Sequence, residues 1–80
     1  MATTVKTNNG RIAVRFLTNG GNKNDIFVNA LELNTDNGRY EYWFTIGEYK
    51  TLAGAKRAAA KKMAKFGYTV NAKQLDNLKL

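Results

Sequence analysis

The chain has 80 residues, a formal net charge of +7, and neither cysteine nor histidine. So short a chain can bury one modest core, and it has no disulfide, thiolate or imidazole to stabilise it. We therefore expect a single domain over residues 1–80, with no signal peptide, no membrane-spanning segment and a cytoplasmic location. The positive charge favours polyanions over neutral ligands as partners.

Three segments alternate polar and apolar residues as strands do, and they cover residues 11–18, 25–33 and 39–46. Residues 1–9 are polar and weakly patterned, and we expect them to be flexible. A loop rich in glycine and asparagine, residues 19–24, joins the first two strands. Asn37-Gly38 predicts a hairpin between the second and the third strand. Short connections of this kind predict an antiparallel meander.

An alanine-rich helix is predicted over residues 51–67. Its apolar stripe would face the sheet, and the stripe consists of Leu52, Ala55, Ala59, Met63 and Phe66. Thr51 is the expected N-cap, and Gly67 is expected to end the helix in a left-handed conformation. The fold class is therefore α+β: a three-stranded antiparallel meander with one basic helix packed on one face (β-β-β-α).

Residues 10–67 form the predicted sheet-plus-helix core, and residues 68–80 form a C-terminal extension. Within the extension, residues 68–70 suggest a short further strand. Asn71 and Gln74 suggest a capping box that opens a short helix with Leu75 and Leu78 facing inward.

The second predicted strand is apolar on both sides, with Ile26 and Val28 on one face and Phe27 and Leu31 on the other. A strand of this kind is normally covered on both faces, and one helix covers only one. We expect the tail (Leu75, Leu78, Leu80) or a second subunit to cover the other face, unless a bulge near Asn29 shifts the register. A homodimer would form through this sheet face.

The residue types needed for catalysis are largely missing. Without histidine or cysteine, the chain lacks the commonest general base, the thiol nucleophile and the usual transition-metal ligands. Its six carboxylates are scattered, and no glycine-rich phosphate loop is present. We predict no enzyme, no catalytic residue, no metal site and no cofactor.

Cations line the outer side of the predicted helix, where Arg57, Lys61 and Lys65 recur at every fourth position. Like charges at this spacing repel, at a cost of about 0.2–0.5 kcal/mol per pair, and a negatively charged partner would relieve the repulsion. Together with Lys56, these residues are expected to contact phosphates without regard to sequence. The alternative interpretation is a solvated face that keeps a small protein soluble.

A second set of candidate residues lies on the strands: Arg11, Arg15, Arg39 and Trp43 are expected on the sheet face opposite the helix. Arginines bind phosphates or guanine edges, an indole packs on sugar or thymine methyl, and antiparallel ribbons fit the major groove. The alternative is that Trp43 packs beneath the C-terminal tail and the arginines surround it.

Residues 46–58 resemble the strand-to-helix corner of AP2/integrase-type DNA-binding domains. The shared pattern Gly-x-Phe/Tyr-x-Thr-x-x-x-Ala-x-x-Ala falls on Gly47, Tyr49, Thr51, Ala55 and Ala58. The resemblance implies a helix behind three antiparallel strands whose arginines and tryptophans enter the major groove. Residues 55–61 are also similar to the second helix of double-stranded-RNA-binding domains, which grip phosphates by shape.

Two functions follow as hypotheses. The first is non-catalytic binding of nucleic acid, with duplex DNA favoured, and the cationic helix stripe supports it. The second is a phage-type host-takeover or anti-defence factor that docks on an acidic surface of a host protein, because small, basic, asparagine-rich proteins without catalytic residues are typical of that class. The apolar residues on both sides of the second strand favour this second hypothesis.

Overall fold

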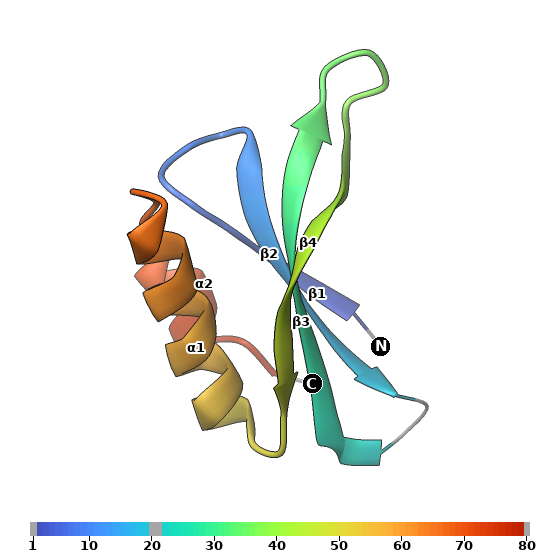
Figure 1. Ribbon diagram of the computed structural model, residues 1–80, viewed down its shortest axis with the longest axis vertical. Helices are drawn as coiled ribbons and strands as arrows, with labels where there is room; N and C mark the ends of the chain where they lie inside the picture. Colours follow the sequence, from blue (N-terminus) through green and yellow to red (C-terminus); the bar gives the residue numbers. More distant parts are fainter. Residues whose placement is uncertain (1, 20–21, 80) are drawn as a thin grey trace.

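The computed structural model describes residues 2–19 and 22–79, in which four strands form one antiparallel sheet in the order β1-β2-β3-β4. Their bounds are β1 Ala2–Lys6, β2 Ile12–Asn19, β3 Asn22–Asn34 and β4 Arg39–Tyr49. Helices α1 (Leu52–Lys65) and α2 (Ala72–Asp76) both lie on the same side of the sheet (Figure 1). The α+β class and the antiparallel meander are thus confirmed, but the sheet has a fourth strand.

The additional strand is β1, which lies in the segment expected to be flexible. It pairs with β2 along its whole length, and Val5, only 1% exposed, faces Val14 in the core. Its outer edge is held by the C-terminal segment, because the Lys6 carbonyl accepts from Asn71 N–H and the Lys6 N–H donates to Gln74 Oε1, both at 2.8 Å. These long-range bonds order residues that have little pattern of their own.

The hydrophobic core lies between the sheet and α1. Ala55, Ala59 and Met63 of α1 are fully buried against apolar side chains of the strands. Leu78 joins the same cluster, and Leu75 packs against it. The expectation that the tail covers the second sheet face is therefore wrong for these two leucines, and Leu80 lies outside the described residues.

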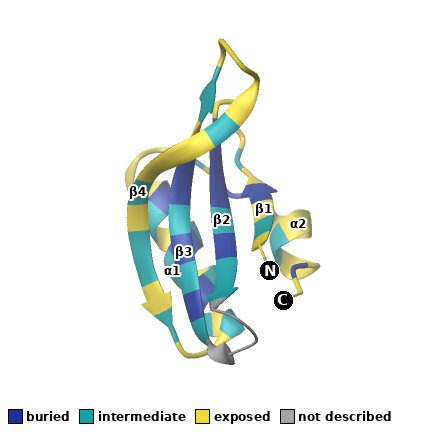
Figure 2. Cartoon of the chain, turned by 90° about the vertical axis from the view of Figure 1, so that its right-hand side faces the viewer, coloured by how far each residue is buried: buried dark blue, intermediate teal, exposed yellow. Residues whose placement is uncertain are grey.

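The second side of the sheet carries no helix, as Figure 2 shows, and we call it the open face. Leu31 and Ala13 are buried there among neighbouring side chains, yet neither belongs to the cluster beneath α1. The strand pairing assigns eight central residues to the open face: Ala13, Arg15, Leu17, Phe27, Asn29, Leu31, Tyr42 and Thr45.

The predicted ends of α1 are confirmed. Thr51 Oγ1 accepts from the Gly54 N–H at 3.1 Å. At the other end Gly67 has φ +85°, its N–H donates to the Ala64 carbonyl, and Tyr68 N–H donates to the Met63 carbonyl. This pair of bonds is a Schellman motif, which satisfies carbonyls that the helix end leaves free.

The predicted hairpin and the α2 cap are also present, with differences in detail. Gly38 has φ +71°, but no described non-glycine residue has a positive φ. The turn is therefore not the two-residue type that needs positive φ at both Asn37 and Gly38. Asn71 Oδ1 accepts from Gln74 N–H as expected, but the Gln74 side chain binds β1 instead of closing the capping box.

Neither of the two helices in the described part of the chain combines the length and the hydrophobicity needed to span a bilayer.

Candidate nucleic-acid interface

An extra residue in β4 decides which of its aromatic side chains face α1. Leu31 of β3 pairs with Tyr42, whereas the preceding Ala30 pairs with Phe44, so that Trp43 is left over between the two pairs. A bulge of this kind interrupts the alternation of side chains along a strand. Tyr42 therefore lies on the open face with Leu31, whereas Phe44 packs against the core beneath α1.

A second register shift follows in β4, opposite Val28 and Asn29 of β3. Val28 pairs with Gly47 and Asn29 pairs with Thr45, which makes Ile46 the extra residue. The possible bulge near Asn29 is present as this irregularity, but the inserted residue belongs to β4. Both bulges add side chains on the side of the sheet that faces α1.

Trp43 belongs to a group of three rings, the aromatic cluster, which consists of Trp43, Phe44 and Phe66. The Trp43 ring centre lies 4.9 Å from that of Phe44 and 5.7 Å from that of Phe66. Phe66 follows the last residue of α1, so the indole lies on the helix side. The prediction that Trp43 shares the opposite face with the sheet arginines is wrong, and the bulge is the reason.

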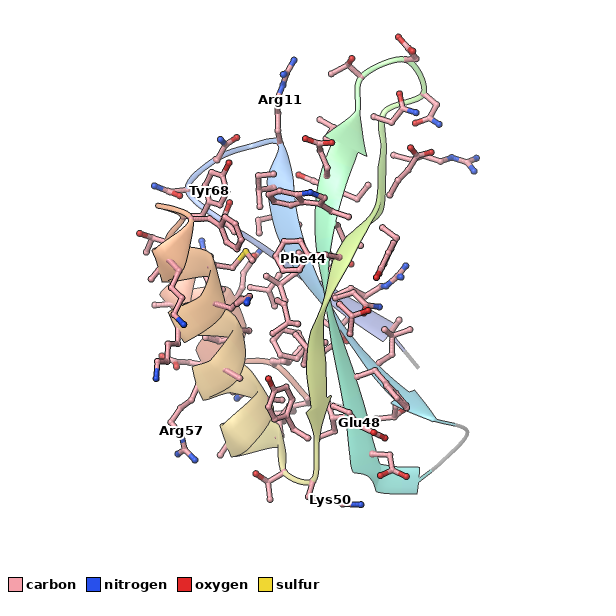
Figure 3. The ribbon with its side chains drawn as sticks, in the orientation of Figure 1. Arg11, Phe44, Glu48, Lys50, Arg57 and Tyr68 are labelled. Carbon is pink, nitrogen blue, oxygen red and sulfur yellow. The ribbon has the colours of Figure 1, made fainter. Side chains whose placement is uncertain are left out.

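The three sheet arginines do not form one site. Arg15 lies in the middle of the open face between Thr4 and Asn29, and its Nε is buried without a hydrogen-bond partner among the described residues. Arg11 points away from the end of the sheet (Figure 3). Arg39 starts β4 opposite Asn34, one position before the Tyr40–Leu33 pair, so alternation places it on the other side from Arg15.

Lysines of α1 do gather, beside β4. A groove of about 210 Å³ runs between the helix and this edge strand. Six side chains line it: Ile46, Tyr49, Ala58, Lys61, Lys62 and Lys65. Lys61 and Lys65 were predicted from the sequence, and the structure adds Lys62 and Tyr49. We call Lys61, Lys62 and Lys65 the groove lysines.

The other two cations of α1 lie elsewhere on the helix. Arg57 is exposed and points away from the sheet (Figure 3). Lys56 is half-buried, and it lies about 120° around the helix from Lys62, on the flank away from the groove. The predicted helix set therefore divides, with Lys61 and Lys65 in the groove, Arg57 on the outer surface and Lys56 on the far flank.

No acidic side chain neutralises these cations in the part of the chain that the structure describes. The ion pair found there joins Lys50 Nζ to Asp25 Oδ1 at 3.3 Å, away from α1. The first turn of α1 contains no acidic residue, and its last turn adds Lys62 and Lys65. The groove and the outer face of α1 therefore form a continuous positive surface.

Besides Tyr49, the residue pattern did not indicate Lys62 and Phe66 as site residues. Lys62 is only half-buried, at the boundary of the apolar stripe, where a lysine stem can lie on apolar surface while its ammonium stays in water. Phe66 belongs to the predicted stripe, yet it is 49% exposed because it stands at the end of the helix. A helical projection shows the Lys62 position, but Phe66 needed the three-dimensional structure.

The described carboxylates do not gather in threes that could hold a metal ion. A wider hollow of about 480 Å³ lies between β1 and α2, and it is lined by the apolar Val5 and Leu78 together with polar residues such as Gln74, Lys73 and Lys79. It contains no aromatic side chain among its lining residues.

Comparisons with protein-family models, with curated proteins and with solved structures gave no match. The function is therefore inferred from the residues of the site itself.

Proposed function

We propose that this chain binds nucleic acid, without catalysis, through α1 and the adjoining edge of β4. The observation that carries the proposal is the convergence of the groove lysines on one groove with no acidic partner among the described residues. Like charges held together on one helix repel, and a polyanion relieves that repulsion. Lysine ammonium groups bind phosphates as mobile point charges, so contacts of this kind do not depend on sequence.

Duplex DNA is the polymer that the sequence favours, with bases read by arginines and a tryptophan on the sheet. The β4 register weakens that part of the hypothesis, because Trp43 lies beside Phe66 and Arg15 remains alone in the middle of the open face. Phosphate contacts through α1 do not need a reading face. We therefore propose backbone binding through Lys61, Lys62, Lys65 and Arg57 as the primary mode.

Fluorescence anisotropy against labelled duplex DNA, single-stranded DNA and duplex RNA, each across a salt series, tests the proposal. Charge reversal in the double variant Lys61→Glu/Lys65→Glu is expected to reduce the slope of log K against log salt by about two units on a duplex. The control is Lys73→Glu/Lys79→Glu, which changes the net charge equally on the exposed tail. An unchanged slope in the α1 variant, or an equal loss in the control, contradicts the proposal.

The open face supports a protein partner as a second candidate function. Neither helix covers this face, and Tyr42 is 59% exposed above the buried Leu31. Exposed aromatic side chains beside apolar surface are typical of protein interfaces. In a pull-down from host lysate, Tyr42→Lys is expected to lose a partner held by this face and to leave nucleic-acid binding unchanged.

A further inference from the structure

We infer that the ligand of this site is a single-stranded segment of nucleic acid, whose bases stack on Trp43 and Phe66 while the groove lysines hold its phosphates. The inference rests on the proposed function and names its substrate class. Proteins that bind single strands without sequence preference combine a positive groove with aromatic rings on which successive bases stack. Here both features belong to the same two elements, β4 and α1.

The aromatic cluster is partly exposed to solvent, unlike the rings of a packed core. Trp43 is 38% exposed and Phe66 is 49% exposed, although each ring contacts the other and Phe44. Neither ring stacks parallel on the indole, since the interplanar angles are 74° to Phe44 and 52° to Phe66. The neighbouring rings therefore hold the indole in place at an angle, and neither of them forms a parallel stack with it. A base can still add such a parallel stack.

The cluster is continuous with the groove. Along β4, Ile46 lines the groove, and it comes two residues after Phe44 and three after Trp43. Along α1, Phe66 follows Lys65 directly and lies one turn beyond Lys62, both of them groove lysines. A strand that places its phosphates on these ammonium groups thus has rings within reach of its bases.

A duplex cannot use this arrangement in the same way. Its bases are paired and stacked, so their flat faces are not available to Trp43 without unstacking, which costs a few kcal/mol per step. An unpaired strand presents those faces freely, and each base that stacks on an aromatic ring strengthens binding. The location of Trp43 beside the groove lysines thus favours the single strand.

Trp43 is the one tryptophan of the chain, so its fluorescence reports directly on the aromatic cluster. The test compares three probes of equal length at low salt: oligo(dT), the same strand with abasic sites in place of its bases, and a duplex. Oligo(dT) is expected to quench the Trp43 emission and to bind more tightly than the abasic strand. Quenching by oligo(rU) as well would extend the class to RNA.

Variants identify the rings that contact the bases. Anisotropy with labelled oligo(dT) is expected to show a loss of roughly five- to 150-fold for Trp43→Leu, the range that one stacked base supports. Phe66→Leu is expected to weaken binding in the same direction and keeps Trp43 as the reporter. Tyr42→Leu, an exposed aromatic on the open face, is the matched control and is expected to bind normally. Thermal melts confirm that each variant is folded.

The outcomes separate this inference from the proposed function. Salt-dependent binding of all three probes with equal affinity and no quenching overturns base stacking and leaves the proposed function intact. No binding of any probe, even at low salt, overturns both. A Trp43 emission that changes with protein concentration in the absence of nucleic acid assigns the cluster to self-association and also overturns the inference.

Discussion

The ring of Tyr49 lies directly against the backbone of Gly47: a Cβ atom on residue 47 would stand 2.6 Å from the Tyr49 hydroxyl oxygen and 2.9 Å from Cζ. Close approach of this side chain is therefore what favours glycine here, since the φ of Gly47 is not in the left-handed region. Tyr49 in turn lines the groove beside the groove lysines. The position of Tyr49 in the groove therefore depends on Gly47, which does not itself line the groove.

Gly47→Ala is expected to lower the free energy of unfolding by about 1 kcal/mol, because the new methyl group must displace the outer end of the Tyr49 ring, which can shift. Chemical denaturation measures the change. Gly10→Ala is the control, since a Cβ atom there meets nothing within 4 Å. In a Tyr49→Leu background the cost of the alanine should fall markedly, and an undiminished cost would show that another contact is responsible.

Gly67 is required for a different reason, its φ of +85° after the end of α1. Gly67→Ala is expected to destabilise the protein by about 1–2 kcal/mol, the cost of the left-handed conformation for a residue with a Cβ atom. Gly67→Asn should cost less, because asparagine tolerates this conformation. Thermal denaturation compares the two variants, and equal losses would mean that the conformation is not the cause.

Local sequence signals were sufficient to predict the elements whose formation depends on interactions within a few residues. The alternation in β2, the alanine-rich stripe of α1, Thr51 and Gly67 each act within a few residues, and each is confirmed. The order and class of the fold follow from such signals together with short connections.

Two features of the fold could not be predicted from the local sequence. Residues 39–46 alternate without a break, yet Trp43 is inserted as a bulge whose ring packs on Phe66, far along the chain. β1 has one large apolar side chain, Val5, and its outer edge is held by the segment around Asn71. Long-range contacts outweigh local propensity in both cases.

For the site too, the sequence predicted the residues that depend on local structure and not those that depend on long-range contacts. Lys61 and Lys65 were predicted because a helix places every fourth residue on one side, whereas Lys62 was not. The sheet set was not assembled, since one extra residue in β4 moves Trp43 to the other side of the sheet from Arg15. The groove is formed by two elements, β4 and α1. Tyr49 lines it with its ring packed closely on Gly47, a contact that the sequence pattern does not show.

The contribution of β1 can be tested at Val5, which is 1% exposed. Val5→Ala is expected to lower the free energy of unfolding by about 1.5–3 kcal/mol, from lost burial and the cavity that remains. Thr4→Ala changes the exposed neighbouring residue of the same strand and should have a much smaller effect. Denaturant titration distinguishes them, and a silent Val5→Ala would show that β1 is not part of the cooperative fold.

We expect the cationic face of α1 to lower the stability of the unbound protein while it strengthens binding. Lys61 has Arg57 and Lys65 one turn away on either side, so Lys61→Gln removes two repulsive pairs and is expected to raise the free energy of unfolding by about 0.4–1 kcal/mol at low salt. At 1 M salt the Debye length falls to about 3 Å and the gain should disappear. Lys79→Gln, on the exposed tail, is the control for the change in net charge. Affinity for nucleic acid should fall in the same Lys61→Gln variant, and a variant that is both less stable and fully able to bind would show that this lysine serves the fold.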